Sequence, residues 1–242
     1  MPVAIVTGAS KGFGRALTLS LARDSWTLII DARRSAELTD VGESVAHLGA
    51  DVVAIPGDVS DPDHRATLVA AAAERGALDL LVNNASTLGP SPLPRLTDYP
   101  RDALQRVIDV NVLAPLALVQ AALPLLRTSG GTVVAISSDA AVEAYAGWGG
   151  YGASKAALDH LHRVLAVEET AVRWYVVDPG DMRTEMHQAA FAGEDISDRP
   201  EPETIVPAVR SLLASGAASG RYRASDWASD RVSDWASDWT SA

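Results

Sequence analysis

A tyrosine and a lysine stand four residues apart, Tyr151 and Lys155, at the start of a stretch of helix-forming composition. Residues four apart lie on the same face of a helix, so the phenol and the ammonium group would be neighbours. A phenol with its usual pKa of about 10 is a poor base at neutral pH, but a nearby cation stabilises the phenolate and lowers that pKa. The spacing suits a general acid and base. Such pairs also arise by chance on helical surfaces, so the assignment of a catalytic role needs support from further residues.

A glycine-rich turn follows the apolar run at residues 3–6. It reads TGASKGFG from Thr7 to Gly14 and leads into the helix-like segment RALTLSLAR. Glycine permits positive φ and close approach of the backbone to a ligand, while the first turn of a helix offers unpaired N–H groups and a positive dipole end. Strand, turn and helix together predict a pyrophosphate-binding site, with a plain tight loop as the alternative. The glycines alone do not name a reaction.

The Gly-x3-Gly-x-Gly spacing of this turn resembles that of the short-chain dehydrogenase/reductase family. The resemblance continues at Asp58-Val59, at the segment NNAS (residues 83–86) and at Pro179-Gly180-Asp181-Met182-Arg183-Thr184, and it runs from Pro2 to about Ala224. One departure is Ser86, which stands where the family usually has glycine. The resemblance implies a single-domain α/β fold with a doubly wound parallel sheet of the Rossmann type that binds a nicotinamide dinucleotide.

The same resemblance assigns roles to four residues. Tyr151 would donate a proton to a carbonyl oxygen while the nicotinamide delivers hydride to carbon, and Lys155 would also hold the nicotinamide ribose. Ser138, thirteen positions before Tyr151, would hydrogen-bond the substrate carbonyl; spacing favours it over the adjacent Ser137. Asn111 lies in an otherwise apolar helical segment, where a buried amide must find partners. Its counterpart in the family holds a water that connects to the lysine, and a satisfied core asparagine is the alternative.

The form of the cofactor depends on the residues that end the second apolar run. By alignment to the family, Ala32 falls where NAD-preferring members carry an acid, and Arg33 falls where NADP-preferring members carry a base. Lys11 adds a second cation, and Arg34 follows, so NADP(H) is expected over NAD(H). A register error of one residue would make Asp31 the ribose-binding acid and reverse the preference. The cofactor contacts implied by the resemblance are Gly8, Ser10, Lys11, Gly12, Phe13, Gly14, Arg33, Arg34, Asp58, Val59, Asn84, Ala85, Tyr151, Lys155, Pro179, Gly180, Met182 and Thr184.

These motifs predict an NADP-dependent carbonyl reductase or, because the reaction is reversible, a secondary-alcohol dehydrogenase. The alternatives are an NAD-dependent alcohol dehydrogenase of the same fold and a dinucleotide-binding regulator that has lost the chemistry, although such proteins usually lose one of the four residues above. No G-x-S-x-G elbow surrounds Ser138, which argues against a hydrolase. We expect the substrate to contact residues 87–99, residues 142–150 with Tyr145 and Trp148 as candidate walls, and a mobile lid at residues 185–200.

The composition of this 242-residue chain disfavours several classes of partner and of site. Its formal net charge of −11 disfavours nucleic acid and anionic membranes as partners. The absence of cysteine excludes disulfides and thiolate chemistry, and the scattered histidines lack metal-ligand spacing, so no metal site is expected. The N-terminus lacks the features of a signal peptide, and no apolar run approaches the length that spans a bilayer. We expect a cytoplasmic enzyme acting on a small carbonyl or alcohol.

Short apolar runs alternate with helical segments along the chain, which predicts a parallel sheet covered on both faces. The expected strands are residues 3–6, 27–30, 52–55, 78–82, 132–136 and 172–177. Because such sheets bind ligands beyond the carboxyl ends of their strands, the motifs should gather there.

We expect one catalytic domain over residues 1–224, followed by a tail at 225–242 with the repeat SDWA, SDRV, SDWA, SDWT. The repeat places Trp227, Trp235 and Trp239 outside the predicted core, on an extended or helical chain. A solvated appendage and an oligomer contact are both open interpretations. A homo-oligomer, either a dimer or a tetramer, is expected.

Overall fold

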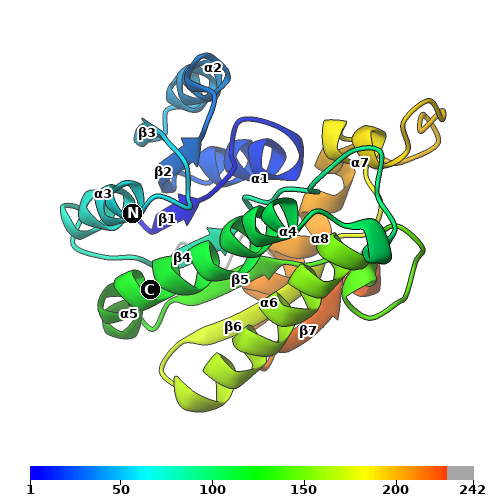
Figure 1. Ribbon diagram of the computed structural model, residues 1–242. Coiled ribbons are helices and arrows are strands. Elements are labelled where there is room, and N and C mark those ends of the chain that lie inside the picture. Colours follow the sequence, from blue (N-terminus) through cyan, green and yellow to red (C-terminus); the bar gives the residue numbers. More distant parts are fainter. Residues whose placement is uncertain (228–242) are drawn as a thin grey trace.

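A seven-stranded parallel sheet forms the centre of the computed structural model, which describes residues 1–227 (Figure 1). The strands lie in the order β3-β2-β1-β4-β5-β6-β7. Their bounds are β1 Val3–Val6, β2 Thr27–Ala32, β3 Val52–Pro56, β4 Leu80–Asn83, β5 Thr132–Ile136, β6 Arg173–Asp178 and β7 Gly220–Arg223. The strand order reverses between β1 and β4, which creates a crevice at the carboxyl ends of these strands. The predicted doubly wound sheet is confirmed.

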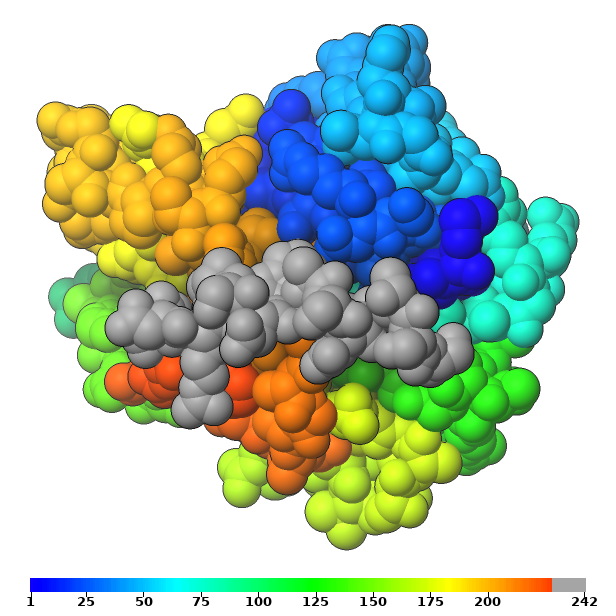
Figure 2. All heavy atoms as spheres, turned by 180° about the vertical axis from the view of Figure 1, so that it is seen from behind, coloured from blue at the N-terminus to red at the C-terminus, as the bar shows by residue number. Residues whose placement is uncertain are grey.

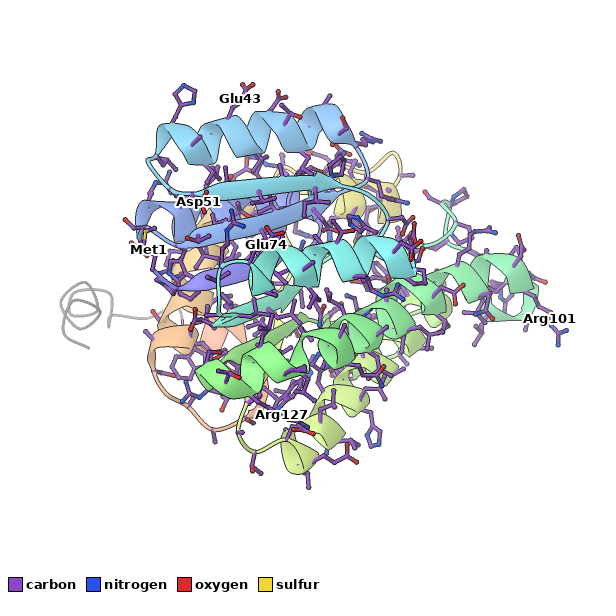
Figure 3. All side chains as sticks on the ribbon, turned by 90° about the vertical axis from the view of Figure 1, so that its left-hand side faces the viewer. Met1, Glu43, Asp51, Glu74, Arg101 and Arg127 are labelled. Atoms are coloured by element: carbon purple, nitrogen blue, oxygen red, sulfur yellow. The ribbon has the colours of Figure 1, made fainter. Side chains whose placement is uncertain are left out.

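Helices cover both faces of the sheet because successive side chains of each strand point to opposite sides. Their bounds are α1 Gly12–Arg23, α2 Ser35–His47, α3 Pro62–Ala73, α4 Arg101–Ile108, α5 Ala114–Ser129, α6 Gly149–Glu168, α7 Glu185–Ala190 and α8 Pro202–Ala214. Ala4 and Val6 pack with α1, α2 and α8. Figure 2 shows the molecule from the side on which these helices lie. Val3 and Ile5 pack on the other side with α3 and α5, which lie next to each other in Figure 3.

Four short helical turns complete the described chain. Three are 3₁₀ turns, at Leu96–Asp98, Asp139–Ala141 and Ala224–Trp227. The fourth is a π-helical turn at Asp109–Leu113, which joins α4 to α5. Such turns widen a helix by one residue and often occur at functional sites.

The structure corrects three expectations from the sequence. The sheet has a seventh strand, β7, whose sequence GRYR lacks an apolar run because all four residues are only partly buried or exposed. Trp227 is not outside the core: its ring packs edge-on against Tyr222 with centroids 5.8 Å apart, and it joins the apolar cluster on that face. The remainder of the expected tail, with Trp235 and Trp239, lies outside the described residues.

The third correction concerns the expectation that no apolar run approaches the length that spans a bilayer. Because the π-helical turn joins α4 and α5 without a break, Arg101–Ser129 form one helical run that is long and apolar enough, by length and composition, to cross a membrane. In this structure 44% of its most apolar stretch is buried inside the protein. Val119 and Ala122 of α5 belong to the apolar cluster beneath the sheet, so the apolar residues of this run have a place in the core.

Candidate active site

Tyr151 and Lys155 lie in the first half of α6 and are buried, with 8% and 2% of their surface exposed. The ammonium of Lys155 is 5.5 Å from the centroid of the Tyr151 ring and donates a hydrogen bond to the main-chain oxygen of Ile136, at 2.7 Å. Burial lowers the pKa of Lys155 to about 8. Burial also raises the pKa of Tyr151, and the charge of Asp139 adds to that increase. The sequence suggests a lowered tyrosine pKa; in this structure desolvation outweighs the contribution that lowers the pKa, a hydrogen bond with Ser86.

Asn111 lies in the π-helical turn and is 1% exposed. Its amide nitrogen donates to the main-chain oxygen of Thr87 and to Ser154 Oγ, both at 2.9 Å. Its oxygen accepts the N–H of Thr87 at 2.8 Å and the hydroxyl of Ser86 at 3.1 Å. The side-chain amide is therefore saturated, since it has two donors and two acceptor positions. The side chain of Asn111 ties the loop after β4 to α6. The water relay expected at Asn111 remains a prediction. Because the side-chain amide is saturated, such a relay would have to use another group of this residue, such as its main-chain carbonyl.

Ser137 and Ser138 directly follow β5, and their hydroxyls contact different partners. The hydroxyl of Ser137 donates to Asp159 in the interior, whereas that of Ser138 donates to Asp139 Oδ1 at 2.9 Å. Ser138, Tyr151 and Asp139 line one cavity, as does part of Ser137. Both serines line the cavity, and the role of Ser138 as the ligand-binding serine remains a prediction.

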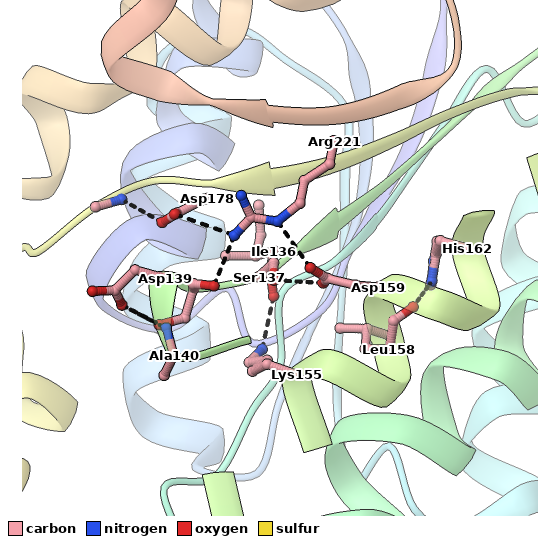
Figure 4. A network of polar contacts seen from close by, with 12 residues as sticks. Ile136, Ser137, Asp139, Ala140, Lys155, Leu158, Asp159, His162, Asp178 and Arg221 are labelled. Atoms are coloured by element: carbon pink, nitrogen blue, oxygen red, sulfur yellow. Dashed lines mark hydrogen bonds and ion pairs between the residues drawn. The ribbon is translucent and has the colours of Figure 1, made fainter. Parts of the chain in front are cut away.

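A buried polar network lies beneath these residues (Figure 4). Arg221 of β7 reaches Asp159 Oδ2 at 3.0 Å, Asp178 Oδ2 at 3.3 Å and the main-chain oxygen of Ser138 at 2.9 Å. Asp159 lies one helical turn after Lys155, and its charge favours the ammonium form of that lysine. One guanidinium thus connects the end of β5, the end of β6 and α6. Sequence reasoning missed Arg221, because nothing in a short polar strand at the sheet edge signals such a contact.

The expected cofactor residues surround an elongated cavity of about 880 Å³ at the carboxyl edge of the sheet. Gly8 and Gly12 have φ values of 65° and 55°, which glycine adopts without strain. A Cβ on Gly14 would lie 2.4 Å from the Gly8 oxygen, so this glycine allows close packing of the turn. Of the expected contacts, Gly14 and Pro179 do not line the cavity, and Gly180 lines the neighbouring one. The others line it: Gly8, Ser10, Lys11, Gly12, Phe13, Arg33, Arg34, Asp58, Val59, Asn84, Ala85, Tyr151, Lys155, Met182 and Thr184.

Asp31, the residue that could have reversed the cofactor preference, is 1% exposed, and each of its carboxylate oxygens has a partner in the protein. Its Oδ1 accepts the N–H of Gly8 at 2.7 Å, and its Oδ2 lies 3.0 Å from Nε2 of His64. Desolvation raises the pKa of this carboxyl, although both contacts act against that increase. Asp31 therefore serves to hold the glycine turn against β2 and α3, and no sequence motif announced its partner His64.

Two acidic residues contact the cations expected to bind the cofactor. Glu37 lies 2.7 Å from Arg34 and 3.4 Å from Lys11. Lys11 also contacts Glu185, at the start of α7, at 2.6 Å. The contact with Arg34 holds the pKa of Glu37 below its usual range. Sequence reasoning missed both carboxylates, since acidic residues in the first turn of a helix are common for reasons of helix stability alone.

A second cavity of about 380 Å³ adjoins the first and shares Tyr151 with it. The expected wall residues Tyr145 and Trp148 both line it, together with Met186, His187 and Phe191 of the expected lid. Trp148 lies edge-on to Tyr151 with ring centroids 5.8 Å apart. Among the residues that the structure describes, no group of three His, Asp or Glu side chains is placed to hold a metal ion.

A glycine turn between β1 and α1, placed where the strand order reverses, and a buried Tyr/Lys pair beside it define a dinucleotide-binding α/β protein. Residues 2–195 match the family model described as short chain dehydrogenase. An uncharacterised oxidoreductase of Saccharomyces cerevisiae is 35% identical over 76% of this chain and 72% of its own length. An 11-beta-hydroxysteroid dehydrogenase of Sesamum indicum is 32% identical over 92% of this chain and 65% of its own length.

Solved structures agree with this assignment. An alcohol dehydrogenase from Thermococcus sibiricus, complexed with 5-hydroxy-NADP, superposes with a TM-score of 0.83 at 28% identity, over 92% of this chain and 95% of the other. A short-chain dehydrogenase from Shigella flexneri, complexed with NADP, has a TM-score of 0.86 at 29% identity, over 93% of this chain and 97% of the other. The chain belongs to the short-chain dehydrogenase/reductase family of oxidoreductases.

Proposed function

We propose that this protein transfers a hydride between NADP(H) and a carbonyl compound or secondary alcohol, with Tyr151 as the acid and base. The observation that carries the proposal is that Tyr151 forms part of the wall of both cavities, the large one with the glycine turn and the smaller one with Ser138. A ligand in one cavity would meet a ligand in the other at the phenol. The bound nicotinamide would supply or accept the hydride.

In the direction of reduction, the phenol of Tyr151 donates its proton to the carbonyl oxygen. The single O–H of Ser138, which donates to Asp139 Oδ1 in this structure, turns to donate a hydrogen bond to the same oxygen. Lys155, held by the Ile136 carbonyl, places a positive charge beside the phenolate that remains. Asn111 keeps the π-helical turn and α6 in register through Ser154. In oxidation the same groups act in reverse, with the phenolate accepting the alcohol proton.

The preference for NADP(H) is supported by the charges at the cofactor cavity. Lys11, Arg33 and Arg34 line it. Asp31 lines it too, but both of its carboxylate oxygens have partners, Gly8 and His64. Cations suit a 2′-phosphate, and a ribose-binding acid is the mark of NAD. Two related structures contain NADP-type ligands.

The test is turnover of a panel of ketones and aldehydes, followed by the absorbance of NADPH and, separately, of NADH. We expect a higher kcat/KM with NADPH. A preference for NADH would contradict the cofactor proposal alone, and absence of turnover with either cofactor across the panel, and with the matching alcohols, would contradict the proposed reaction.

We further propose that the protein is a cytoplasmic homo-oligomer. Its catalytic domain would cover residues 1–224 and its tail residues 225–242, with Trp227 of the tail packed onto the domain. Light scattering of the full chain and of a chain ending at Trp227 tests the assembly and the role of the tail together. If both chains form the same oligomer, residues 228–242 are not needed for the contact between subunits.

A further inference from the structure

The carboxylate of Asp139 lines the smaller cavity next to Ser138, and only neutral groups contact it. Its Oδ1 accepts the hydroxyl of Ser138 at 2.9 Å and the N–H of Ala140 at 2.7 Å, and its Oδ2 accepts the hydroxyl of Tyr145 at 2.9 Å. Within residues 1–227 it forms no ion pair with a lysine, arginine or histidine. Arg221, which lies in the network of Figure 4, is committed to Asp159, Asp178 and the Ser138 carbonyl.

The other carboxylate that lines this cavity, Asp181, does have basic partners in the protein. It lies 3.3 Å from Arg199 and 3.9 Å from Nδ1 of His187. Arg199, which also pairs with Asp198, therefore offsets part of the negative charge of Asp181. The charge of Asp139 is available to a ligand, and its Oδ2 retains an acceptor position because a carboxylate oxygen has two lone pairs.

Besides Tyr151, the aromatic rings of Tyr145, Trp148 and Phe191 line the same cavity. Tyr145 is hydrogen-bonded to Asp139, and Trp148 and Phe191 lie with their ring centroids 6.0 Å apart. The faces of aromatic rings attract cations, most strongly when the site is partly shielded from water. A carboxylate without a protein cation and a set of aromatic walls together form a receptor for a positively charged group, in a space of about 380 Å³ that suits a small molecule.

The place of Asp139 also affects the proposed reaction. Ser138 binds the oxygen that gains negative charge during reduction, and a carboxylate one hydrogen bond away opposes that gain. The same charge raises the pKa of Tyr151 and so disfavours the phenolate. A neutral substrate meets both penalties. A substrate that carries a positive charge beside its carbonyl group would offset them when it binds.

We propose that the substrate is an amino ketone or amino aldehyde, or the matching amino alcohol, whose positively charged nitrogen binds Asp139 between the rings of Tyr145 and Trp148. This inference rests on the proposed hydride transfer at Tyr151 and names the substrate class for that site. The cation lies close to the carbonyl group, because Asp139 and Ser138 are in direct contact.

The test compares two ketones of nearly the same shape. Phenacyltrimethylammonium carries a permanent charge, and 3,3-dimethyl-1-phenylbutan-1-one has carbon in place of the nitrogen. We expect kcat/KM for the charged ketone to exceed that for the neutral one by about tenfold or more. In Asp139→Asn the ratio should fall to near one. Glu143→Gln removes the same charge from an exposed position on the same loop, outside the cavity, and should keep the wild-type ratio.

Calorimetric titration of both ketones into the protein separates this inference from the proposed reaction. Tighter binding of the charged ketone that Asp139→Asn abolishes supports the cation site, even if neither ketone is turned over. Equal binding and equal turnover of the two ketones by the wild type would overturn the inference and leave the reductase proposal intact. A preference for the charged ketone that survives Asp139→Asn would overturn it as well.

Discussion

Arg221 donates a hydrogen bond to the main-chain oxygen of Ser138 while its Nε contacts Asp159, one helical turn from Lys155. A residue of the edge strand β7 thus holds two parts of the candidate active site that belong to β5 and α6. The guanidinium suits this task because its donors form a rigid planar fork that can reach several acceptors at once.

Replacing Arg221 with methionine should destabilise the protein, because Asp159 and Asp178 would lose their cation in a buried setting. We expect a loss of about 2–4 kcal/mol in the free energy of unfolding, measured with urea. The matched control is Arg106→Met: Arg106 pairs with Asp102 in the open, where an ion pair contributes under about 1 kcal/mol. Equal effects of the two substitutions would argue against the network.

Tyr151→Phe should lower kcat by about 10²- to 10⁴-fold, the usual contribution of a positioned general acid. Loss of one hydroxyl leaves the ring and its packing against Trp148 in place, so stability should change little. Tyr222→Phe is the control, since its hydroxyl contacts Ala218 far from either cavity. Unchanged turnover in Tyr151→Phe would remove this residue from the mechanism.

Lys155→Met should abolish turnover and yet stabilise the cofactor-free protein. Burial lowers the pKa of Lys155 to about 8 from 10.5; because the fold favours the neutral amine, the charged form costs stability below pH 8. Methionine removes that cost, and the gain should be about 1–3 kcal/mol at pH 7. As the pH rises from 8 to 10.5 the gain should disappear. Urea unfolding at pH 7 and at pH 10 measures both values, and a loss of stability at pH 7 would contradict the prediction.

Glu37→Gln should improve the use of NADPH, because Glu37 contacts both Lys11 and Arg34 and would compete with a 2′-phosphate for them. We expect the KM for NADPH to fall by about 3- to 10-fold, with a smaller change for NADH. Glu43→Gln on the outer side of α2, labelled in Figure 3, is the control. If Glu37 instead binds the ribose of NAD, the substitution would raise the KM for NADH and would not lower the KM for NADPH.

His162→Leu should reduce the loss of stability in acid. The ring is buried on Trp174 with centroids 6.0 Å apart, and burial lowers its pKa to about 4 from 6.5. The fold therefore favours the neutral ring, and stability is lost as the pH falls from 6.5 to 4. The contribution amounts to about 3 kcal/mol.

Urea unfolding at pH 7, 5.5 and 4.5 should show a shallower slope in His162→Leu than in the wild type. His160→Leu, an exposed position on the same helix, serves as the control and should keep the wild-type slope. An unchanged slope in the His162 variant would show that this ring does not govern the acid response.

The sequence by itself determined the family, the parallel sheet and the grouping of motifs at its carboxyl edge. Periodicity showed the buried strands because residues covered on both faces must be apolar, and glycine spacing showed the turn because only glycine tolerates its φ values. The same reasoning missed β7, whose residues are partly exposed, and left Trp227 outside the core.

Only the tertiary structure decided which polar groups meet. Sequence alone left Asp31 open as a ribose ligand, and the structure shows that one of its oxygens contacts Gly8 and the other His64. Arg221 and Ser138 are separated by 83 residues, and Asp139 became a candidate cation site because its neighbours in space are neutral and aromatic. Contacts between side chains from distant segments depend on strand order and helix packing, and local sequence patterns record neither.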